Sequence, residues 1–104
     1  MSVVTTLILT ASIMESKEDA EGNDTFPAVD HINAGLGGGY LRQVDQHAGG
    51  NKAPQAYAFM AAINYLNLDE FKRHVREAPW REPENVLLLV NGEHDSGFHV
   101  ESWR

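Results

Sequence analysis

Histidine side chains can carry out acid–base and metal chemistry near neutral pH, and this chain has five of them. They are His31, His47, His74, His94 and His99. A metal site needs three or four converging ligands, and neither a His-x-His nor a His-Glu-x-x-His pattern occurs. His94 and His99 are the candidate metal ligands, because they could face each other across a terminal hairpin with about 5 Å between their Cβ atoms. We favour the alternative, in which both are incidental residues of a surface hairpin.

A second candidate for chemistry is the glycine-rich segment Gly35–Pro54, which holds six glycines in twenty residues. A glycine loop that cradles phosphate lies before a helix, whose N-terminus supplies N–H donors. These glycines instead follow a predicted helix, and they match neither G-x-G-x-x-G nor the P-loop pattern. Lys52, in the second glycine cluster, is a candidate for an anion site beside backbone N–H groups. We favour an ordinary hairpin turn there.

Nucleophilic catalysis has no signature in this sequence. The G-x-S-x-G elbow does not occur, and the five serines are scattered along the chain. The fifteen Asp and Glu residues could supply an acid–base pair, but no single carboxylate stands out without knowledge of its burial. Catalytic residues therefore stay unassigned and no cofactor is predicted. The sequence favours a binding or assembly module over an enzyme.

The composition predicts one soluble domain. A chain of 104 residues with 42% hydrophobic content suits a single domain with one modest core. Disulfides and thiolate chemistry are excluded, because there is no cysteine. The net charge of −7 opposes direct contact with nucleic-acid phosphates. The run Val3–Met14 lacks the basic flank of a signal peptide and is too short to span a membrane, so we expect a cytoplasmic protein without membrane contact.

Two helices and five strands are predicted to position these residues. Val3–Met14 is rich in β-branched residues, which favours a strand, whereas the acidic segment Glu15–Asp24 favours a solvated loop. The other elements are a helix capped by Thr25 and stopped by the glycines from Gly35 onward, strands at Tyr40–His47 and within Ala53–Asn67, a helix from Asn67 to Pro79, and strands at Val86–Glu93 and Phe98–Trp103. Turns are expected at Ala48–Asn51 and at Asp95–Gly97.

The element order β-α-β-β-α-β-β predicts an α+β fold of the ferredoxin-like type. This fold is a sandwich with two helices on one face of an antiparallel sheet, here of four to five strands. The first and third strands are central in that arrangement. They are also the two segments that are apolar on both faces, which supports the assignment. One domain is expected to span residues 1–104.

Two helices can cover only one face of such a sheet. The other face would expose apolar side chains, and a monomer seldom leaves a large apolar patch in water. We therefore predict a homodimer that pairs through this open face, with Ile8, Met60 and Trp103 as interface candidates. For Trp103 the alternative is a place in the core of its own domain.

In its inferred strand order, from Val3 to Trp103, the chain resembles the dimeric α/β-barrel proteins, which are small domains that pair sheet to sheet. Some members of that group are monooxygenases that act on polyketides or haem, and others only bind ligands. The resemblance implies a small enzyme or a carrier of an apolar ligand as an alternative function. It assigns no catalytic residue to this chain.

For an apolar ligand, the candidate pocket residues are Tyr57, Phe59, Met60 and Trp80, whose aromatic and thioether side chains suit a flat molecule. Core packing explains these residues equally well. A third interpretation is an acidic inhibitor that competes with nucleic acid for a basic protein partner, which the charge of Glu15–Asp24 motivates.

Overall fold

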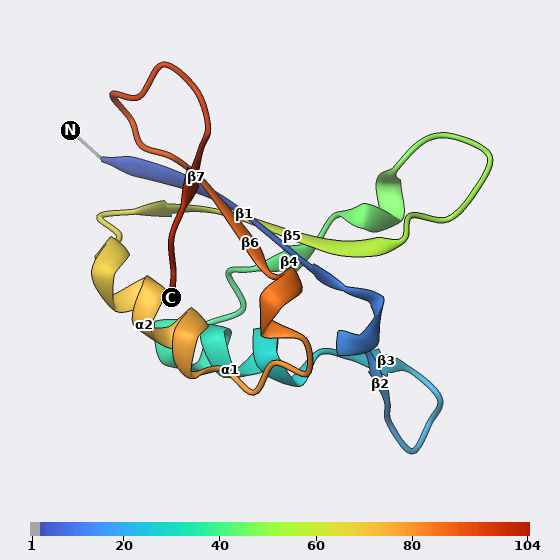
Figure 1. Ribbon diagram of the computed structural model, residues 1–104. Coiled ribbons are helices and arrows are strands. Elements are labelled where there is room, and N and C mark those ends of the chain that lie inside the picture. The colour runs from blue at the N-terminus through green and yellow to red at the C-terminus, as the bar shows by residue number, and fades with distance from the viewer. Residues whose placement is uncertain (1–2) are drawn as a thin grey trace.

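The computed structural model describes residues 3–104, which form two α-helices, a five-stranded antiparallel sheet and a separate two-stranded sheet. The strands are β1 (Val4–Ser12), β2 (Lys17–Glu18), β3 (Asp24–Thr25), β4 (Arg42–Gln43), β5 (Ala56–Asn64), β6 (Leu87–Asn91) and β7 (His99–Glu101). The helices are α1 (Pro27–Leu36) and α2 (Leu68–Glu77), with short 3₁₀ helices at Ile13–Glu15, Asp45–His47 and Pro83–Asn85. Both α-helices lie on one side of the five-stranded sheet (Figure 1), which confirms the expected α+β class. No helix within residues 3–104 has the length and apolar character needed to cross a membrane.

The sheet order is β4-β5-β1-β6-β7, so β1 lies at the centre with β5 beside it. β1 pairs with β5 along nine residues, from Val4 opposite Asn64 to Ser12 opposite Ala56. On its other side β1 pairs with β6, and β7 pairs with β6 at the edge. This order is compatible with a ferredoxin-like arrangement, and the terminal hairpin adds the fifth strand that the sequence predicts.

The core lies between the sheet and the two helices. Alternate residues of a strand point to opposite faces of a sheet, so each strand contributes every second side chain. The largest fully buried side chains are Leu7, Leu9, Ile32, Phe71, Val75 and Leu88. They come from β1, β6 and both helices, and they belong to one contiguous cluster. Burial of each such side chain contributes about 1.5–3 kcal/mol, so this single layer holds the helices on the sheet.

The helix boundaries largely follow the predicted capping signals. Asn67 caps α2, since its side-chain oxygen accepts a hydrogen bond from the Glu70 N–H at 3.1 Å. α1 stops at Gly37, whose left-handed φ of 83° suits glycine. The start of α1 differs from the prediction, because Thr25 belongs to β3. Its hydroxyl donates to the Lys17 carbonyl at 2.6 Å, which leaves α1 without a side-chain cap.

The acidic segment Glu15–Asp24 is not the open loop that its charge predicts. Near its ends the chain pairs as β2 and β3. Between these strands the Asp19 side chain accepts hydrogen bonds from the N–H groups of Glu21 and Asn23, both at 2.9 Å, which closes the turn. At the start of the segment Glu15 is buried, with 5% of its surface exposed. Hydrogen bonds to carboxylates therefore offset the like-charge repulsion.

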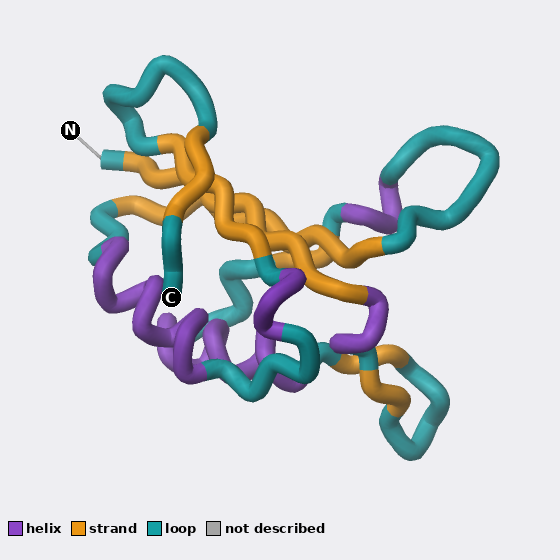
Figure 2. The backbone as a smooth tube through the Cα atoms, in the orientation of Figure 1, coloured by secondary structure: helices purple, strands orange, loops and turns teal. Residues whose placement is uncertain are grey.

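The expected strand Tyr40–His47 shortens to the two residues of β4. A 3₁₀ turn follows it, and the Asp45 carboxylate accepts the Ala58 N–H at 2.9 Å in place of continued strand pairing. The expected tight reversal after this strand becomes a longer loop, because β5 begins only at Ala56. Figure 2 shows this loop projecting beyond the sheet.

The last hairpin also turns at a different place from the one predicted. Its hydrogen-bonded turn lies at Gly92–Asp95 rather than at Asp95–Gly97. The Asp95 N–H donates to the Gly92 carbonyl at 3.0 Å, and the Gly92 N–H donates to the Asp95 carboxylate at 2.7 Å. The pairing of the two flanking strands is unaffected, since β6 and β7 still lie side by side.

Candidate functional site

The sheet face that no helix covers is the first candidate surface. Strand pairing aligns one row of residues across it, namely Arg42, Met60, Ile8, Leu89 and Val100. The last four are apolar and come from four different strands. Met60 is 39% exposed and Val100 is 64% exposed, whereas Ile8 and Leu89 between them are half-buried. The predicted interface residues Ile8 and Met60 therefore lie directly opposite each other on the open face.

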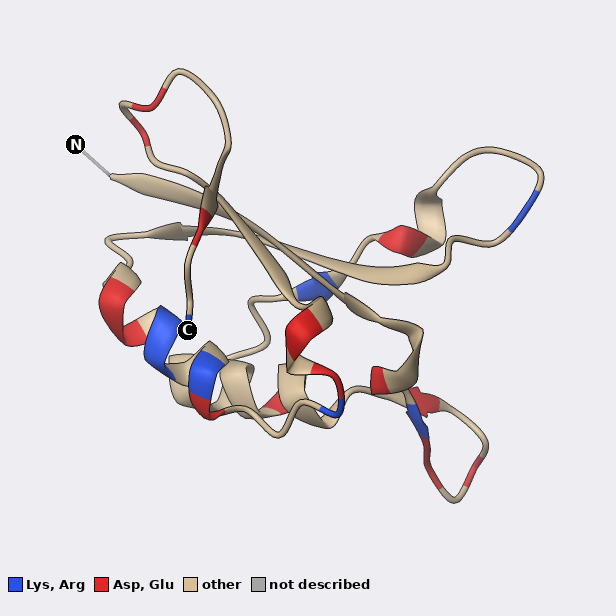
Figure 3. Cartoon of the chain, viewed as in Figure 1, with Lys and Arg blue, Asp and Glu red and all other residues tan. Residues whose placement is uncertain are grey.

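The open face carries almost no charge. Among the residues that the structure describes, its strands present one cation, Arg42, and no carboxylate, although the chain has fifteen Asp and Glu residues. Glu101 of β7 alternates with Val100 and therefore faces the helix side. Figure 3 shows β1, β5 and β6 free of charged residues, with the acids in loops, helices and strand ends. In an acidic protein this face is charge-poor, and around its apolar row it carries the uncharged polar residues Thr6, Thr10, Asn64 and Asn91.

Trp103, the third interface candidate, lies in the core of its own chain. It is 6% exposed, and its indole N–H donates to the Val86 carbonyl at 3.1 Å. Its own carbonyl accepts a hydrogen bond from the Arg76 guanidinium at 3.1 Å. After β7 the chain turns from the sheet toward α2 (Figure 1) and carries the indole into the core. Trp103 is therefore a core residue of its own chain, which is the alternative that the sequence left open, and it is not an interface residue on the open face.

The four predicted pocket residues do not converge on one cavity. Phe59 is buried in the core with Tyr57 beside it, and the Phe26 ring centre lies 4.8 Å from that of Tyr57 and 5.1 Å from that of Phe59. Trp80 packs against the same core, and its indole N–H donates to a backbone carbonyl of α2 at 2.7 Å. Met60 lies on the opposite face of β5. Three of these side chains contribute to packing, and Met60 contributes to the open face.

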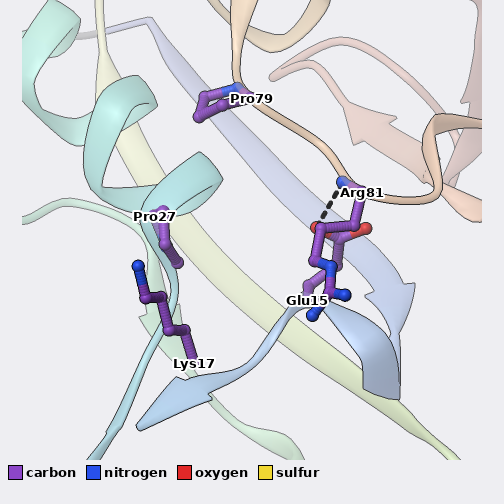
Figure 4. Close-up of a pocket in the computed structure, with 5 residues that line it drawn as sticks. All are labelled: Glu15, Lys17, Pro27, Pro79 and Arg81. Carbon is purple, nitrogen blue, oxygen red and sulfur yellow. Dashed lines mark hydrogen bonds between the residues drawn. The ribbon is translucent and has the colours of Figure 1, made fainter. Parts of the chain in front are cut away.

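A cavity of about 350 Å³ lies between the 3₁₀ helix that follows β1, the start of α1 and the segment after α2 (Figure 4). Its lining residues are Glu15, Lys17, Pro27, Pro79 and Arg81. Both carboxylate oxygens of Glu15 are bonded: Oε1 accepts the Arg81 N–H at 2.9 Å, and Oε2 accepts the Glu82 N–H at 2.8 Å. The buried carboxylate therefore fixes the segment after α2 against the end of β1.

Glu82, next to this cavity, is also held by hydrogen bonds. Bonds from the Ser12 side chain and then from Asn85 keep the pKa of the Glu82 carboxyl below its ordinary value, although partial desolvation opposes them. Sequence reasoning missed this whole arrangement. Its one local signal is that Glu15 directly follows the apolar run of the central strand, so that the chain is still close to the core there.

The two candidate metal ligands have different carboxylate neighbours in the structure. His94 is exposed in the loop after β6, with Glu93 at 4.0 Å. His99 in β7 has Glu101 at 2.9 Å and Asp95 at 3.6 Å. Within residues 3–104 no group of three or more His, Cys, Asp and Glu side chains is arranged to hold a metal ion.

Lys52, the anion candidate of the sequence, lies exposed in the loop before β5. Gly50 in that loop has a φ of 101°, which glycine adopts without strain. The loop that holds Lys52 extends away from the sheet and from both helices (Figure 1), and Lys52 is not among the residues that line the cavity beside Glu15.

A polar cluster joins α2 to β7 on the helix side of the sheet. Lys72 Nζ lies 2.8 Å from Glu101 Oε1, and His99 Nε2 lies 2.9 Å from Glu101 Oε2. Hydrogen bonds from Lys72 and then from His99 hold the pKa of Glu101 below its ordinary value, although partial burial opposes the shift. The Glu101 side chain is 23% exposed, so water screens part of this interaction.

We expect Glu101→Gln to lower the melting temperature near neutral pH and to have less effect as the pH falls. Because the folded-state pKa of Glu101 is depressed, its contribution is present above the ordinary value of 4.5 and is lost as pH falls through the folded value. Melting curves of both proteins between about pH 7 and pH 3 measure this difference. Glu77→Gln, at an exposed carboxylate of α2 outside the cluster, is the control. A difference between wild type and Glu101→Gln that grew on acidification would contradict the prediction.

Comparison with known protein families, curated proteins and solved structures finds no significant match to this chain. The functional argument therefore rests on two features of the chain itself. One is the charge-poor sheet face with its apolar row, and the other is the cavity beside Glu15.

Proposed function

We propose that this chain is a binding and assembly module that forms a homodimer through the open face of its sheet. The observation that carries the proposal is the apolar row of Met60, Ile8, Leu89 and Val100, which crosses four strands. Removing apolar surface from water contributes about 25 cal/mol per Å², so covering this row favours association. The strand-order resemblance to proteins that pair sheet to sheet supports the same geometry.

A second copy of the chain is the partner that fits this face best. Each chain carries a net charge of −7, so two copies repel each other across most of their surfaces. On the part of the chain that the structure describes, the strands of the open face present no carboxylate, so pairing there does not bring carboxylates of the paired strands together. A basic protein partner would instead bind the acidic loops, because the open face offers it no opposite charge.

The size of the open face suits a small dimer interface. With about 4.8 Å between strands and about 3.4 Å per residue, the strands cover roughly 450 Å². Exposed side chains that stand above this plane, including Leu87 and Phe98, bring the area toward the roughly 600 Å² per partner of the smallest specific interfaces. We therefore expect a reversible dimer with a dissociation constant on the order of 1 µM.

Light scattering or sedimentation at micromolar concentrations tests this proposal. The average mass of the wild-type particle should rise with concentration and approach twice the 11.5 kDa mass of the chain well above the dissociation constant. Met60→Lys places an ammonium group in the interface of both copies, and burying an unpaired charge costs several kcal/mol. Dimerisation should therefore weaken by about 100-fold or more. The matched control is Met14→Lys, because Met14 is 46% exposed but lies beyond the end of β1.

Circular dichroism should show that both lysine variants keep the wild-type fold, since both methionines are already partly exposed. A folded wild type that stays monomeric at every concentration contradicts the proposal. A dimer that survives Met60→Lys but dissociates with Met14→Lys contradicts it as well, because the interface would then lie elsewhere.

A further inference from the structure

The cavity beside Glu15 has the size and the lining of a ligand site. Its volume of about 350 Å³ lies at the small end of the about 300–1,000 Å³ of small-molecule sites. Figure 4 shows Lys17 and Pro27 on one side of the cavity and Glu15 with Arg81 on the other, while Pro79 borders a third side. Rigid apolar proline rings and charged side chains therefore border one small cavity that is open to solvent, because all of these residues except Glu15 are exposed.

The two cations of this cavity are free of ion pairs. In the part of the chain that the structure describes, neither Lys17 nor Arg81 has a carboxylate within ion-pair distance. Acidic partners are plentiful, because the chain has fifteen Asp and Glu residues for eight Lys and Arg residues. Lys72 and Arg73, for comparison, each form an ion pair with a glutamate. Two unpaired cations at one cavity leave their charges available to an anionic ligand.

Glu15 limits the charge that such a ligand can carry. Its carboxylate is buried, and backbone N–H groups hold both oxygens, so it is fixed at the cavity wall. The lining residues carry two positive charges and one negative charge, and the Glu82 carboxylate beside the cavity interacts electrostatically with Arg81. A dianion would therefore add two negative charges to a site that already holds two carboxylates, so a monoanion is favoured.

We propose that this cavity binds a small monocarboxylic acid, with its carboxylate between Lys17 and Arg81 and its apolar body between the rings of Pro27 and Pro79. Lysine and arginine hold carboxylates by charge-assisted hydrogen bonds, and a guanidinium can bind both oxygens at once. A ligand of this size makes few contacts, so its dissociation constant is on the order of 1 mM. The cavity lies on the helix side of the sheet, so ligand binding does not require the dimer.

Titration with sodium benzoate, followed by the amide NMR signals of the protein, tests this site. The N–H groups of Arg81 and Glu82 bond to Glu15 at the cavity wall, so their signals should shift and saturate. Benzamide has the same shape without the charge, and it should bind about 10-fold more weakly or worse. Lys17→Gln and Arg81→Gln should each weaken benzoate binding by about 10-fold. Arg73→Gln removes the same charge from an exposed position on α2 and should leave binding unchanged.

The dispersion of the amide spectrum shows whether each variant is folded. The absence of a saturable benzoate shift at Arg81 and Glu82 would overturn the proposal, and so would equal binding of benzamide. Equal binding of inorganic phosphate at matched ionic strength would also overturn it, because the site would then select neither a monoanion nor an apolar body. Benzoate should bind Met60→Lys as it binds the wild type, which separates this site from the dimer interface.

Discussion

Trp103→Ala is expected to lower the free energy of unfolding by about 3–5 kcal/mol, as large-to-small core substitutions do. The indole is 6% exposed and belongs to the single core cluster. Its removal leaves a cavity and takes away the donor that lies 3.1 Å from the Val86 carbonyl. A domain of this size has about 5–15 kcal/mol of total stability, so one substitution at the second-to-last residue removes a large share.

Chemical denaturation at several protein concentrations measures this loss. A core residue lowers stability by the same amount at every concentration, whereas an interface residue lowers it only where the dimer forms. Arg73→Ala is the control, because Arg73 is an exposed residue of α2 whose ion pair with Glu70 is long, at 3.6 Å. The control should change stability by about 0.5 kcal/mol or less. If Trp103→Ala were as stable as the wild type at low protein concentration, the indole would not be packing in the core.

Glu15→Gln is expected to lower the free energy of unfolding by about 2–4 kcal/mol. The glutamine amide offers one oxygen and one NH₂ group in place of two acceptor oxygens. One of the N–H groups of Arg81 and Glu82 would therefore lose its acceptor and face another donor, which costs about 1–3 kcal/mol for a buried group. The remaining hydrogen bond also weakens, because its acceptor is no longer charged.

Denaturation gives the total loss for Glu15→Gln, and amide hydrogen exchange shows where it arises. Exchange should accelerate most at the N–H groups of Arg81 and Glu82, since those bonds are the ones disrupted. Glu18→Gln is the matched control, because Glu18 is an exposed carboxylate of β2 only three residues away. A loss for Glu18→Gln equal to that for Glu15→Gln would mean that net charge, rather than the buried hydrogen bonds, causes the effect.

Most of the fold could be predicted from local patterns in the sequence. A strand or a helix cap depends on residues within a few positions of each other, as with the Asn67 side chain and the Glu70 N–H. Once the elements were assigned, crossover handedness predicted the central place of β1. Strand alternation left two possible sets of side chains for the open face, and the structure places the set with Ile8 and Met60 there.

Predictions from the sequence failed where a side chain found its partner on another element. The strand expected at Tyr40–His47 is short because the Asp45 carboxylate takes the N–H of Ala58, thirteen residues further along. Thr25 does not cap α1 because its hydroxyl bonds to the carbonyl of Lys17 in the neighbouring strand. The local pattern favours a strand at Asp45 and a helix cap at Thr25. In the structure, hydrogen bonds to residues of other elements replace both.

The sequence by itself determined the class of fold, the order of the elements and the apolar character of both faces of the central strand. Only the tertiary structure decided that Trp103 is in the core and that Glu15 is buried. A carboxylate stays in the interior only where donors replace its water, and the donors for Glu15 lie sixty-six and sixty-seven residues away in the chain. The Val86 carbonyl that binds the Trp103 indole is seventeen residues distant. Such partners meet only after the helices have packed on the sheet, so no periodicity within either segment could indicate them.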